Sequence, residues 1–287
     1  MPKIKKSVIL FGLSKLLGRS LYKKIKEKDY LIKGFSLRKK EWFKEEFYFF
    51  EDFFNKNFEA DFYIYLSAVS GEFQVERDYI NALEVNVITP LKILNRIKNG
   101  HFIYISSASV YENKLFPEEE EANFHNSLYG SMKFAAEGLL KTLSTKKNIK
   151  FTSLRFPRIY GPFMERNPVS DFLKALREKK KEVVLYDDYS SRYEYIFSYD
   201  AAEYILKVMG LGLEGIYNCG SGIVKSVLEI KNIFEKITGE NFNINFKDKR
   251  KGVDTLNSEK IKKFLKIEFT DFEEGIKIIL KEENIIF

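Results

Sequence analysis

The chain has 287 residues, of which 45% are hydrophobic and 31% charged, a composition typical of a globular protein with a sizeable core. Its single cysteine, Cys219, excludes an internal disulfide bond, and its two histidines argue against zinc or histidine-based general-base chemistry, so we expect no bound metal. The net charge of +7 is compatible with nucleic-acid binding, but the lysines alternate with glutamates along the chain. We therefore expect a lysine-rich solvated surface that at most attracts an anionic nucleotide substrate, and no nucleic-acid partner.

No apolar run reaches the length of a transmembrane helix. Residues 1–6 also lack the apolar region of a signal peptide. We expect a cytoplasmic protein without a membrane partner.

Five apolar runs with helical patterns between them organise the first 160 residues. Strands are predicted over 7–11, 31–36, 61–67, 102–106 and 151–156. Helices are predicted over 17–28, about 76–98 and 127–143. Because strands that alternate with helices form parallel sheets with crossover helices, the sequence predicts an α/β protein with a doubly wound parallel sheet.

After residue 160 the pattern changes to loops, short strands and helices. We therefore divide the chain into a nucleotide-binding core, 1–160, and a smaller mixed lobe, 161–287, with strands near 192–222 returning to the core. The smaller lobe is expected to bind substrate, because it would pack over the carboxyl ends of the strands, where open parallel sheets bind their ligands.

Two glycines after the first predicted strand are spaced for a dinucleotide-binding turn. Gly12 allows a tight turn, and Gly18 allows the following helix to pack closely on the strand. Backbone N–H groups at that helix start would face a pyrophosphate. Lys15 stands where the dinucleotide fingerprint has a third glycine. Its side chain either spoils the approach of a phosphate or points outward and places its ammonium beside the phosphate charge, and the local sequence leaves both alternatives open.

Tyr129 and Lys133 are four residues apart, on one face of the predicted helix 127–143. A lysine ammonium beside a phenol favours the phenolate and lowers the pKa of the tyrosine from about 10, so that the tyrosine can exchange a proton at neutral pH. The pattern alone is weak, because Tyr22 and Lys26 have the same spacing. The preceding predicted strand, however, ends in small hydroxyl residues, Ser107 among them, which can donate a hydrogen bond to a substrate carbonyl.

The order of these motifs resembles the extended short-chain dehydrogenase/reductases, the group of nucleotide-sugar epimerases, dehydratases and reductases. The resemblance runs from about residue 7 to residue 280. Its markers are Gly12, Gly18 and the segments DFYIYLSAVSG, NVITPLKIL, YISSASVYE, YGSMKFAAE, LRFPRIYGP, YDAAEYI and GIYNCGSG. It implies a Rossmann-type fold with a smaller substrate lobe, a bound nicotinamide dinucleotide and a nucleotide-sugar substrate.

By this resemblance, Tyr129 is the catalytic acid/base, Ser107 orients the reacting oxygen, and Lys133 binds the nicotinamide ribose and tunes Tyr129. Asn86 matches an asparagine that supports this lysine, and Pro157 lies in the loop at the nicotinamide end. The implied cofactor-binding residues are Gly12, Ser14, Lys15, Leu16, Leu17, Gly18, Ser36, Arg38, Lys39, Leu66, Ser67, Ala68, Asn86, Tyr129, Lys133 and Pro157. The implied substrate-binding residues are Ser107, Ser109, Arg158 and Arg192.

The sequence departs from the family pattern at two positions. Lys15 replaces the middle glycine of the turn. Arg192 stands one residue further from an aromatic-apolar pair than the arginine that contacts substrate phosphate in the family. An apolar or salt-bridged surface role is therefore an equal alternative for Arg192.

The second predicted strand ends in Ser36, where an acidic residue would bind the 2′-hydroxyl of NAD. Arg38, Lys39 and Lys40 follow, and a 2′-phosphate favours such cations over a carboxylate. We therefore predict NADP(H) in preference to NAD. The alternative is a basic turn on a lysine-rich surface.

The leading hypothesis for the function is an NADPH-dependent reductase of a nucleotide-linked 4-keto sugar, with Tyr129 as the proton donor. An NAD-dependent 4-epimerase or 4-dehydrogenase with the same residues is the alternative enzyme. Ala108 and Ser109 stand where the dehydratases of the family carry an Asp-Glu pair, so dehydration is not expected. A dinucleotide-binding protein without catalytic activity is the alternative of another class.

The segments 76–98 and 127–145 carry long apolar faces. In the family the matching helices pair across a two-fold axis into a four-helix bundle, so the resemblance implies a homodimer. The alternative is that these faces pack within the monomer.

Overall fold

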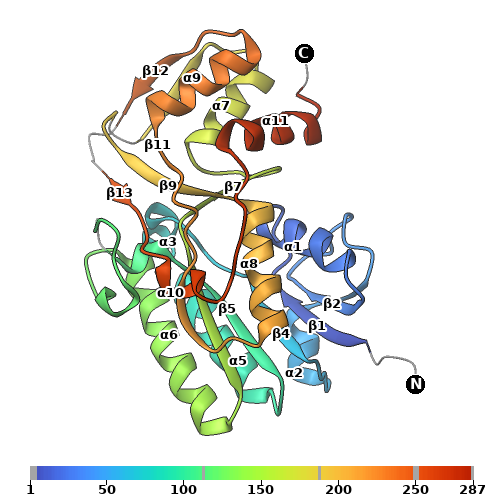
Figure 1. The fold of residues 1–287 in the computed structure, drawn as a ribbon. Coiled ribbons are helices and arrows are strands. Elements are labelled where there is room, and N and C mark those ends of the chain that lie inside the picture. The colour runs from blue at the N-terminus through green and yellow to red at the C-terminus, as the bar shows by residue number, and fades with distance from the viewer. Residues whose placement is uncertain (1–4, 112–113, 187–188, 248–251, 286–287) are drawn as a thin grey trace.

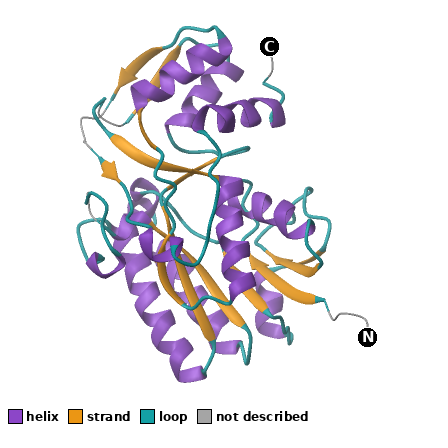
Figure 2. Ribbon diagram, in the orientation of Figure 1, coloured by secondary structure: helices purple, strands orange, loops and turns teal. Residues whose placement is uncertain are grey.

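The computed structural model of the chain describes residues 5–111, 114–186, 189–247 and 252–285. A central sheet with helices on both faces forms the larger part, and a smaller lobe lies at one end of it, above the sheet in Figure 1. Both parts combine helices and strands (Figure 2). The smaller lobe lies next to one end of the strands of the central sheet, and the residues at this end are the ones that concern function.

Seven parallel strands form the central sheet, in the order β10-β6-β5-β4-β1-β2-β3. The order reverses at β1 and β4, because β2 and β3 extend the sheet to one side and β5, β6 and β10 extend it to the other. This topology confirms the predicted α/β class with a doubly wound, Rossmann-type sheet. The strands are β1 (Lys6–Phe11), β2 (Tyr30–Phe35), β3 (Glu46–Tyr48), β4 (Phe62–Tyr65), β5 (His101–Ser107), β6 (Lys150–Phe156) and β10 (Gly215–Asn218).

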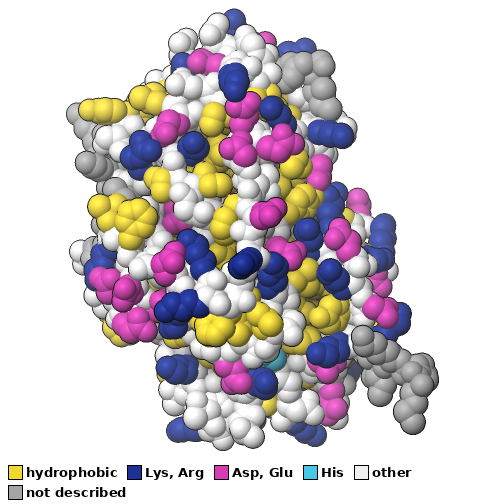
Figure 3. All heavy atoms as spheres, in the orientation of Figure 1, with side chains coloured by type: hydrophobic (Ala, Val, Ile, Leu, Met, Phe, Trp, Pro, Cys, Tyr) yellow, Lys and Arg dark blue, Asp and Glu magenta, His cyan; other side chains and the backbone are white. Residues whose placement is uncertain are grey.

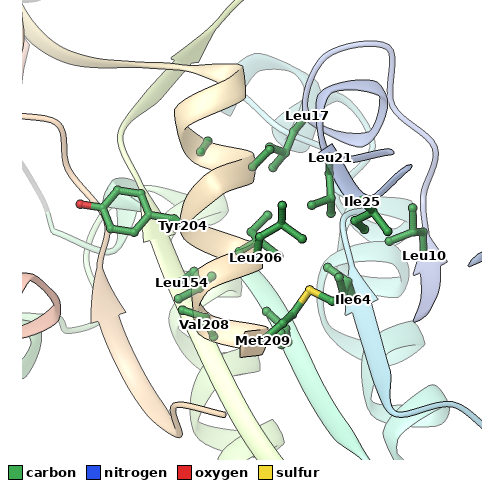
Figure 4. Close-up of a cluster of buried hydrophobic side chains, with 14 of the residues drawn as sticks. Leu10, Leu17, Leu21, Ile25, Ile64, Leu154, Tyr204, Leu206, Val208 and Met209 are labelled. Carbon is green, nitrogen blue, oxygen red and sulfur yellow. The ribbon is translucent and has the colours of Figure 1, made fainter. Parts of the chain in front are cut away.

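Each face of the sheet has its own apolar core, because successive side chains of a strand point to opposite faces. In β1, Val8 and Leu10 belong to the core under α1 and α8, whereas Ile9 and Phe11 belong to the core under α2, α5 and α6. Figure 4 shows the first core, where side chains of α1 and α8 meet those of the strands. Burial of each such side chain contributes about 1.5–3 kcal/mol, so the sheet is held from both sides. The helices are α1 (Leu17–Lys26), α8 (Ser198–Leu211), α2 (Phe50–Asn55), α5 (Thr89–Arg96) and α6 (Leu128–Lys147).

The helix predicted over about 76–98 is interrupted at Asp78, and the backbone is helical from Tyr79 to Arg96. The segment is divided into α3 (Glu72–Arg77), α4 (Tyr79–Leu83), a π-helical turn (Glu84–Ile88) and α5. Asp78 breaks the helix with a non-helical backbone (φ −148°, ψ 71°), and its carboxylate caps α4 by accepting a hydrogen bond from the Asn81 N–H. The π-helical turn contains Asn86, one of the predicted cofactor residues, and such turns are frequent at functional sites.

Among the described residues of the smaller lobe, two small sheets and three helices surround a separate apolar core. β9 (Arg192–Phe197) pairs with β7 (Arg158–Tyr160), β11 (Val224–Ser226) and β13 (Val253–Asp254), and β8 (Glu182–Leu185) pairs with β12 (Asn243–Phe246). The helices are α7 (Pro168–Arg177), α9 (Val227–Thr238) and α11 (Phe272–Glu282). Between β9 and β11 the chain returns to the larger part through α8 and β10, and the short α10 (Glu259–Lys262) packs beside β10.

The charges on the molecular surface are mixed. On the face shown in Figure 3, Lys and Arg side chains are interleaved with Asp and Glu side chains. In the part of the chain that the structure describes, no helix is both long and apolar enough to cross a membrane. The same residues contain no group of three or more His, Cys, Asp and Glu side chains placed to hold a metal ion.

Candidate active site

The predicted turn at Gly12 lies at the carboxyl end of β1, beside the end of β4, where the strand order reverses. Gly12 has a φ of +93°, and a Cβ atom there would lie 2.2 Å from Ser67 Oγ and 2.7 Å from Ser67 N. Only glycine therefore fits this position while the loop after β4 keeps its place. The Gly12 N–H donates a hydrogen bond to the Phe35 carbonyl at the end of β2 (2.8 Å), so the turn joins three strand ends.

The start of α1 presents backbone donors to this edge of the sheet. The Ser14 hydroxyl accepts a hydrogen bond from the Gly18 N–H (2.9 Å), whereas no acceptor for the Leu16 and Leu17 N–H groups lies within the described part of the chain. A Cβ atom on Gly18 would lie 3.2 Å from the Gly12 carbonyl, so the helix packs closely on the turn. Such a helix start, with its positive dipole end, fits the pyrophosphate of a dinucleotide.

Lys15 extends from this turn toward the connection between β7 and α7. Its Nζ lies 2.8 Å from Glu165 Oε1, and the two side chains are 58% and 69% exposed. The ammonium group thus has a carboxylate as its neighbour. Whether it also meets a cofactor phosphate stays a prediction.

Ser36 is buried directly after β2, whereas Arg38 and Lys39 are exposed. The Ser36 N–H donates a hydrogen bond to the Tyr48 carbonyl of β3 (3.2 Å), which holds this strand end in place. A small hydroxyl residue therefore stands at the strand end, and two cations stand outside it. Their role in the choice of cofactor stays a prediction.

The remaining predicted cofactor residues lie at the same edge of the sheet. Leu66, Ser67 and Ala68 follow β4, and the Leu66 N–H donates a hydrogen bond to the Phe11 carbonyl at the end of β1 (2.8 Å). Pro157 joins β6 to β7, where the chain passes from the central sheet into the smaller lobe. The carboxyl ends of four strands, β1, β2, β4 and β6, therefore carry these residues.

Ser107, Tyr129 and Lys133 come together at the carboxyl end of β5. Ser107 is the last residue of β5, and its hydroxyl lies close enough to the Tyr129 hydroxyl to act on the pKa of that group; it also donates a hydrogen bond to Ser109 Oγ (3.1 Å). Tyr129 lies in the first turn of α6 and Lys133 in the next turn, where its Nζ donates to the Ile105 carbonyl (2.9 Å). The Lys133 Nζ is 5.9 Å from the centre of the Tyr129 ring. Two motifs that are separate in the sequence thus form one cluster.

Burial dominates the protonation of this cluster. It raises the pKa of the Tyr129 hydroxyl to about 12, although the Ser107 hydroxyl acts in the opposite direction. Burial also lowers the pKa of the Lys133 ammonium to about 7, against the opposite effect of the Glu137 carboxylate. The predicted lowering of the tyrosine pKa by the lysine is therefore not found. A phenol that keeps its proton at neutral pH is suited to donate that proton to a developing alkoxide.

The start of α6 is held by a carboxylate that sequence reasoning missed. Glu72, the first residue of α3, accepts hydrogen bonds from the Ser127 hydroxyl and the Leu128 N–H (2.6 Å each). Ser127 is the N-cap of α6 and accepts a hydrogen bond from the Gly130 N–H (3.0 Å). A negative charge is stabilising at a helix N-terminus, so Glu72 holds the turn that carries Tyr129. No local pattern could have found it, because Glu72 and Ser127 are 55 residues apart.

Asn86 is linked to Lys133 through the side chain of Tyr104. Its side-chain amide accepts a hydrogen bond from the Val69 N–H (3.1 Å) and donates one to the Val69 carbonyl (2.9 Å). Its backbone carbonyl accepts a hydrogen bond from the Tyr104 hydroxyl (2.9 Å), and the Lys133 Nζ lies 4.5 Å from the centre of the Tyr104 ring. Asn86 therefore holds the loop after β4 in place and supports the Tyr104 ring, which lies beside Lys133.

One turn beyond Lys133, Glu137 forms a buried ion pair with Arg155 of β6. The Arg155 Nη2 lies 2.6 Å from Glu137 Oε2, and neither side chain is more than 2% exposed. Arg155 also donates a hydrogen bond to the Glu119 carbonyl (2.7 Å), and Ser153 donates one to Glu137 (2.9 Å). This network ties α6 to β6 and to the loop that follows β5.

Ser109 is held in the cluster by His125. The Ser127 N–H donates to His125 Nδ1 (3.2 Å), so the ring proton is on Nε2, which donates to the Ser109 carbonyl (2.8 Å). The Ser109 N–H in turn donates to Ser107 Oγ (3.1 Å). The predicted substrate residue Ser109 is thus part of the same cluster as Ser107.

The two predicted substrate arginines lie in the smaller lobe. The Arg158 guanidinium stacks on the Tyr193 ring, 3.5 Å from its centre, and its Nε is 4.0 Å from Asp254 Oδ2. Arg192 begins β9 and forms an exposed ion pair with Glu229 (3.2 Å). Arg192 thus has the salt-bridged arrangement that was the alternative to a substrate contact, and a contact of either arginine with substrate stays a prediction.

The topology and the glycine turn define a Rossmann-type α/β protein, and comparison with known proteins agrees. The profile of the NAD dependent epimerase/dehydratase family matches residues 8–220. The chain therefore belongs to the NAD dependent epimerase/dehydratase family.

Curated relatives with recognisable sequence similarity include two UDP-glucose 4-epimerases. The enzyme of Drosophila melanogaster is 30% identical over an alignment of 178 residues that covers 53% of this chain and 51% of the relative. The enzyme of Yersinia enterocolitica is 29% identical over an alignment of 210 residues that covers 65% of this chain and 62% of the relative. The chain thus matches about half to three fifths of the length of these relatives.

Solved structures with the same fold cover almost the whole chain. The UDP-glucose 4-epimerase of Thermotoga maritima with UDP-glucose has a TM-score of 0.85 and 23% identity, over 97% of this chain and 98% of that one. The UDP-glucose 4-epimerase of Thermus thermophilus in complex with NAD has a TM-score of 0.85 and 19% identity, over 97% and 99%. At these identities the likeness shows the fold.

Proposed function

We propose that the protein is an oxidoreductase that reduces the 4-keto group of a nucleotide-linked sugar with NADPH. The observation that carries this proposal is the cluster of Ser107, Tyr129 and Lys133 at the same edge of the sheet as the Gly12 turn. Family membership supports it, because two similar proteins are named for their action on UDP-glucose.

The chemistry of the cluster suits a reduction. A bound nicotinamide supplies the hydride when it is present. Tyr129 donates its phenolic proton to the sugar oxygen as that oxygen becomes an alkoxide, and Ser107 hydrogen-bonds the same oxygen and holds it in line. Lys133, whose Nζ lies 5.9 Å from the centre of the Tyr129 ring, binds the ribose beside Tyr129. Acid catalysis of this kind contributes about 10²- to 10⁴-fold to the rate.

The cofactor choice depends on the end of β2. Ser36 offers no carboxylate to a 2′-hydroxyl, and the exposed Arg38 and Lys39 provide positive charge for a 2′-phosphate. The replacement Arg38→Asp is expected to weaken NADPH binding by about 10- to 100-fold, because a charged contact of this kind is worth about 1.5–3 kcal/mol. NADH binding is expected to change little. Fluorescence titration of both dinucleotides measures the ratio.

Lys28→Asp is the matched control for Arg38→Asp. Lys28 lies just before β2, at the opposite end of this strand from Arg38. It makes the same kind of charge change and is expected to leave the ratio of NADPH to NADH affinity unchanged. An unchanged ratio in Arg38→Asp itself would contradict the assignment of NADP(H).

An NAD-dependent nucleotide-sugar 4-epimerase is the second candidate, and the comparisons favour it. Both curated relatives described above carry that name, and the solved relative of Thermus thermophilus is in complex with NAD. A reductase consumes one NADPH for each sugar converted, whereas an epimerase converts sugar without net consumption of cofactor. Measurement of that stoichiometry with 4-keto and 4-hydroxy UDP-sugars separates the two. Dinucleotide binding without turnover of any nucleotide sugar would favour the non-catalytic alternative.

We further propose that the protein is a homodimer joined through a four-helix bundle. The helices α3 and α4 expose Phe73, Ile80 and Leu83, and α6 exposes Leu128 and Leu139. α3, α4 and α6 are in contact within the chain, so their exposed side chains can form one apolar surface. A two-fold axis through such a surface would bury it against its own copy.

The replacement Leu139→Asp is expected to convert the dimer to a monomer at micromolar concentration, because it places a charge in the proposed bundle. Sedimentation velocity measures the change. Leu211→Asp is the control, because Leu211 is similarly exposed but lies at the end of α8, outside the bundle. A monomeric wild-type protein would contradict the proposal.

A further inference from the structure

The connection between β7 and α7, residues 161–167, crosses from the glycine turn to the loop after β4; we call it the crossing segment. Phe163 lies under the Arg19 guanidinium of α1, whose carbon is 3.9 Å from the ring centre. Arg166 donates a hydrogen bond to the Ser70 carbonyl in the loop after β4 (3.0 Å). The crossing segment therefore contacts α1 and the loop after β4, which border the proposed pyrophosphate position.

Glu165 is placed among cations in this segment. Its carboxylate hydrogen-bonds the Lys15 ammonium at 2.8 Å. That contact is the main reason that its pKa is lowered, and the positive charges of Lys15, Arg166 and Lys40 add to the effect. One carboxylate thus lies among three cations, beside a helix start that itself favours an anion.

We propose that Glu165 competes with the pyrophosphate of the cofactor for Lys15, and that it thereby sets the affinity for the dinucleotide. This inference rests on the dinucleotide binding of the proposed function. Lys15 precedes the first residue of α1 by two positions, so its ammonium is carried by the turn that would meet the pyrophosphate. A pyrophosphate carries more charge than a carboxylate and is also bound by backbone N–H groups of the helix start.

The exchange of partners is easy because the Lys15–Glu165 pair is exposed. Both side chains are more than half accessible to solvent, and exposed ion pairs contribute little to stability. When phosphate replaces the carboxylate, Glu165 loses its main partner, and this loss reduces the free energy gained when the cofactor binds. Lys15, which stands at the position of the middle glycine, then binds the phosphate, and Glu165 reduces its contribution to the affinity.

The replacement Glu165→Gln tests this inference through binding alone. It keeps the size of the side chain and removes the charge, so the dissociation constants of NADPH and NADH are both expected to fall by about 3- to 10-fold, a Coulomb effect at a few ångströms in an exposed site. The gain is expected to shrink in high salt. Lys15→Met is expected to weaken both dinucleotides, and Glu165→Gln is expected to give no gain in the Lys15→Met background.

Glu259→Gln is the matched control. Glu259 is 72% exposed and pairs with Lys262 at 3.1 Å, but it lies on α10, beside the opposite edge strand β10. It is expected to leave both dissociation constants unchanged.

Three results would overturn the inference. Unchanged or weaker binding in Glu165→Gln would do so, and weaker binding would mean that the pair clamps the cofactor. A gain for NADPH alone would overturn the assignment to the pyrophosphate, which both dinucleotides share. Failure of the wild-type protein to bind either dinucleotide would instead overturn the proposed function on which the inference rests.

Discussion

Replacement of Tyr129 by phenylalanine is expected to lower kcat on the true substrate by about 10²- to 10⁴-fold. The substitution removes the phenolic proton and leaves the ring in its buried place at the start of α6. Because burial raises the pKa of the Tyr129 hydroxyl to about 12, the group is protonated at neutral pH and acts as the donor in the reducing direction. Dinucleotide affinity is expected to remain within about twofold, since the contacts of the Gly12 turn do not involve the hydroxyl.

Tyr22→Phe is the matched control for this experiment. Tyr22 and Lys26 have the same spacing on α1 as Tyr129 and Lys133 on α6, but the Tyr22 hydroxyl contacts Glu45 (3.3 Å) on the opposite face of the sheet. Steady-state kinetics and fluorescence titration of both variants separate turnover from binding. Normal turnover in Tyr129→Phe would show that another group supplies the proton.

The replacement Glu137→Gln is expected to lower the free energy of unfolding by about 3–5 kcal/mol. It leaves the guanidinium of Arg155 almost fully buried without its counter-charge. The cost arises from desolvation of that unpaired charge, and it exceeds what the intact pair contributes. Urea unfolding followed by circular dichroism measures it, with the slope of the transition as a check that the unfolding remains two-state.

Two further variants help to interpret the unfolding result for Glu137→Gln. Glu273→Gln breaks the ion pairs of Glu273 with Lys236 and Lys277, two lysines that are more than half exposed, and the midpoint of unfolding is expected to stay the same. The double variant Glu137→Leu with Arg155→Met removes both charges and is expected to recover much of the stability lost in Glu137→Gln. Equal midpoints for Glu137→Gln and Glu273→Gln would mean that the buried network does not hold α6 on the sheet.

The five strands predicted from apolar runs are present because a strand of a parallel sheet is buried on both faces and therefore reads as continuous apolar sequence. β3 and α2 were not predicted. They have three and six residues, too few for a period to be recognised, and they lie in a stretch rich in aromatic residues. The break at Asp78 was missed because the apolar pattern continues through it, while a side-chain cap and a π-helical turn change the backbone.

The candidate catalytic cluster was readable because its residues lie at strand ends and on one helix face. Ser107 ends a strand, and Tyr129 and Lys133 are one turn apart, so short-range spacing marks each motif, whereas their joint catalytic role was predicted from the family resemblance. The protonation states of Tyr129 and Lys133 could not be predicted from the sequence. The sequence shows a lysine near a phenol, but the extent of burial, which raises one pKa and lowers the other, depends on everything that packs around them.

The sequence by itself determined the α/β class, the alternation of parallel strands with helices, the Gly12 turn and the residues of the candidate catalytic cluster. The fold class and the turn follow from periodicity and from backbone requirements of single residues, whereas the cluster residues were predicted from the resemblance to the extended short-chain dehydrogenase/reductases. Only the tertiary structure decided that Glu72 holds the start of α6 and that Glu165 meets Lys15. Those partners are separated by 55 and 150 residues, and an ionic or capping contact over such distances exists only after the sheet and the smaller lobe have brought the chain segments together.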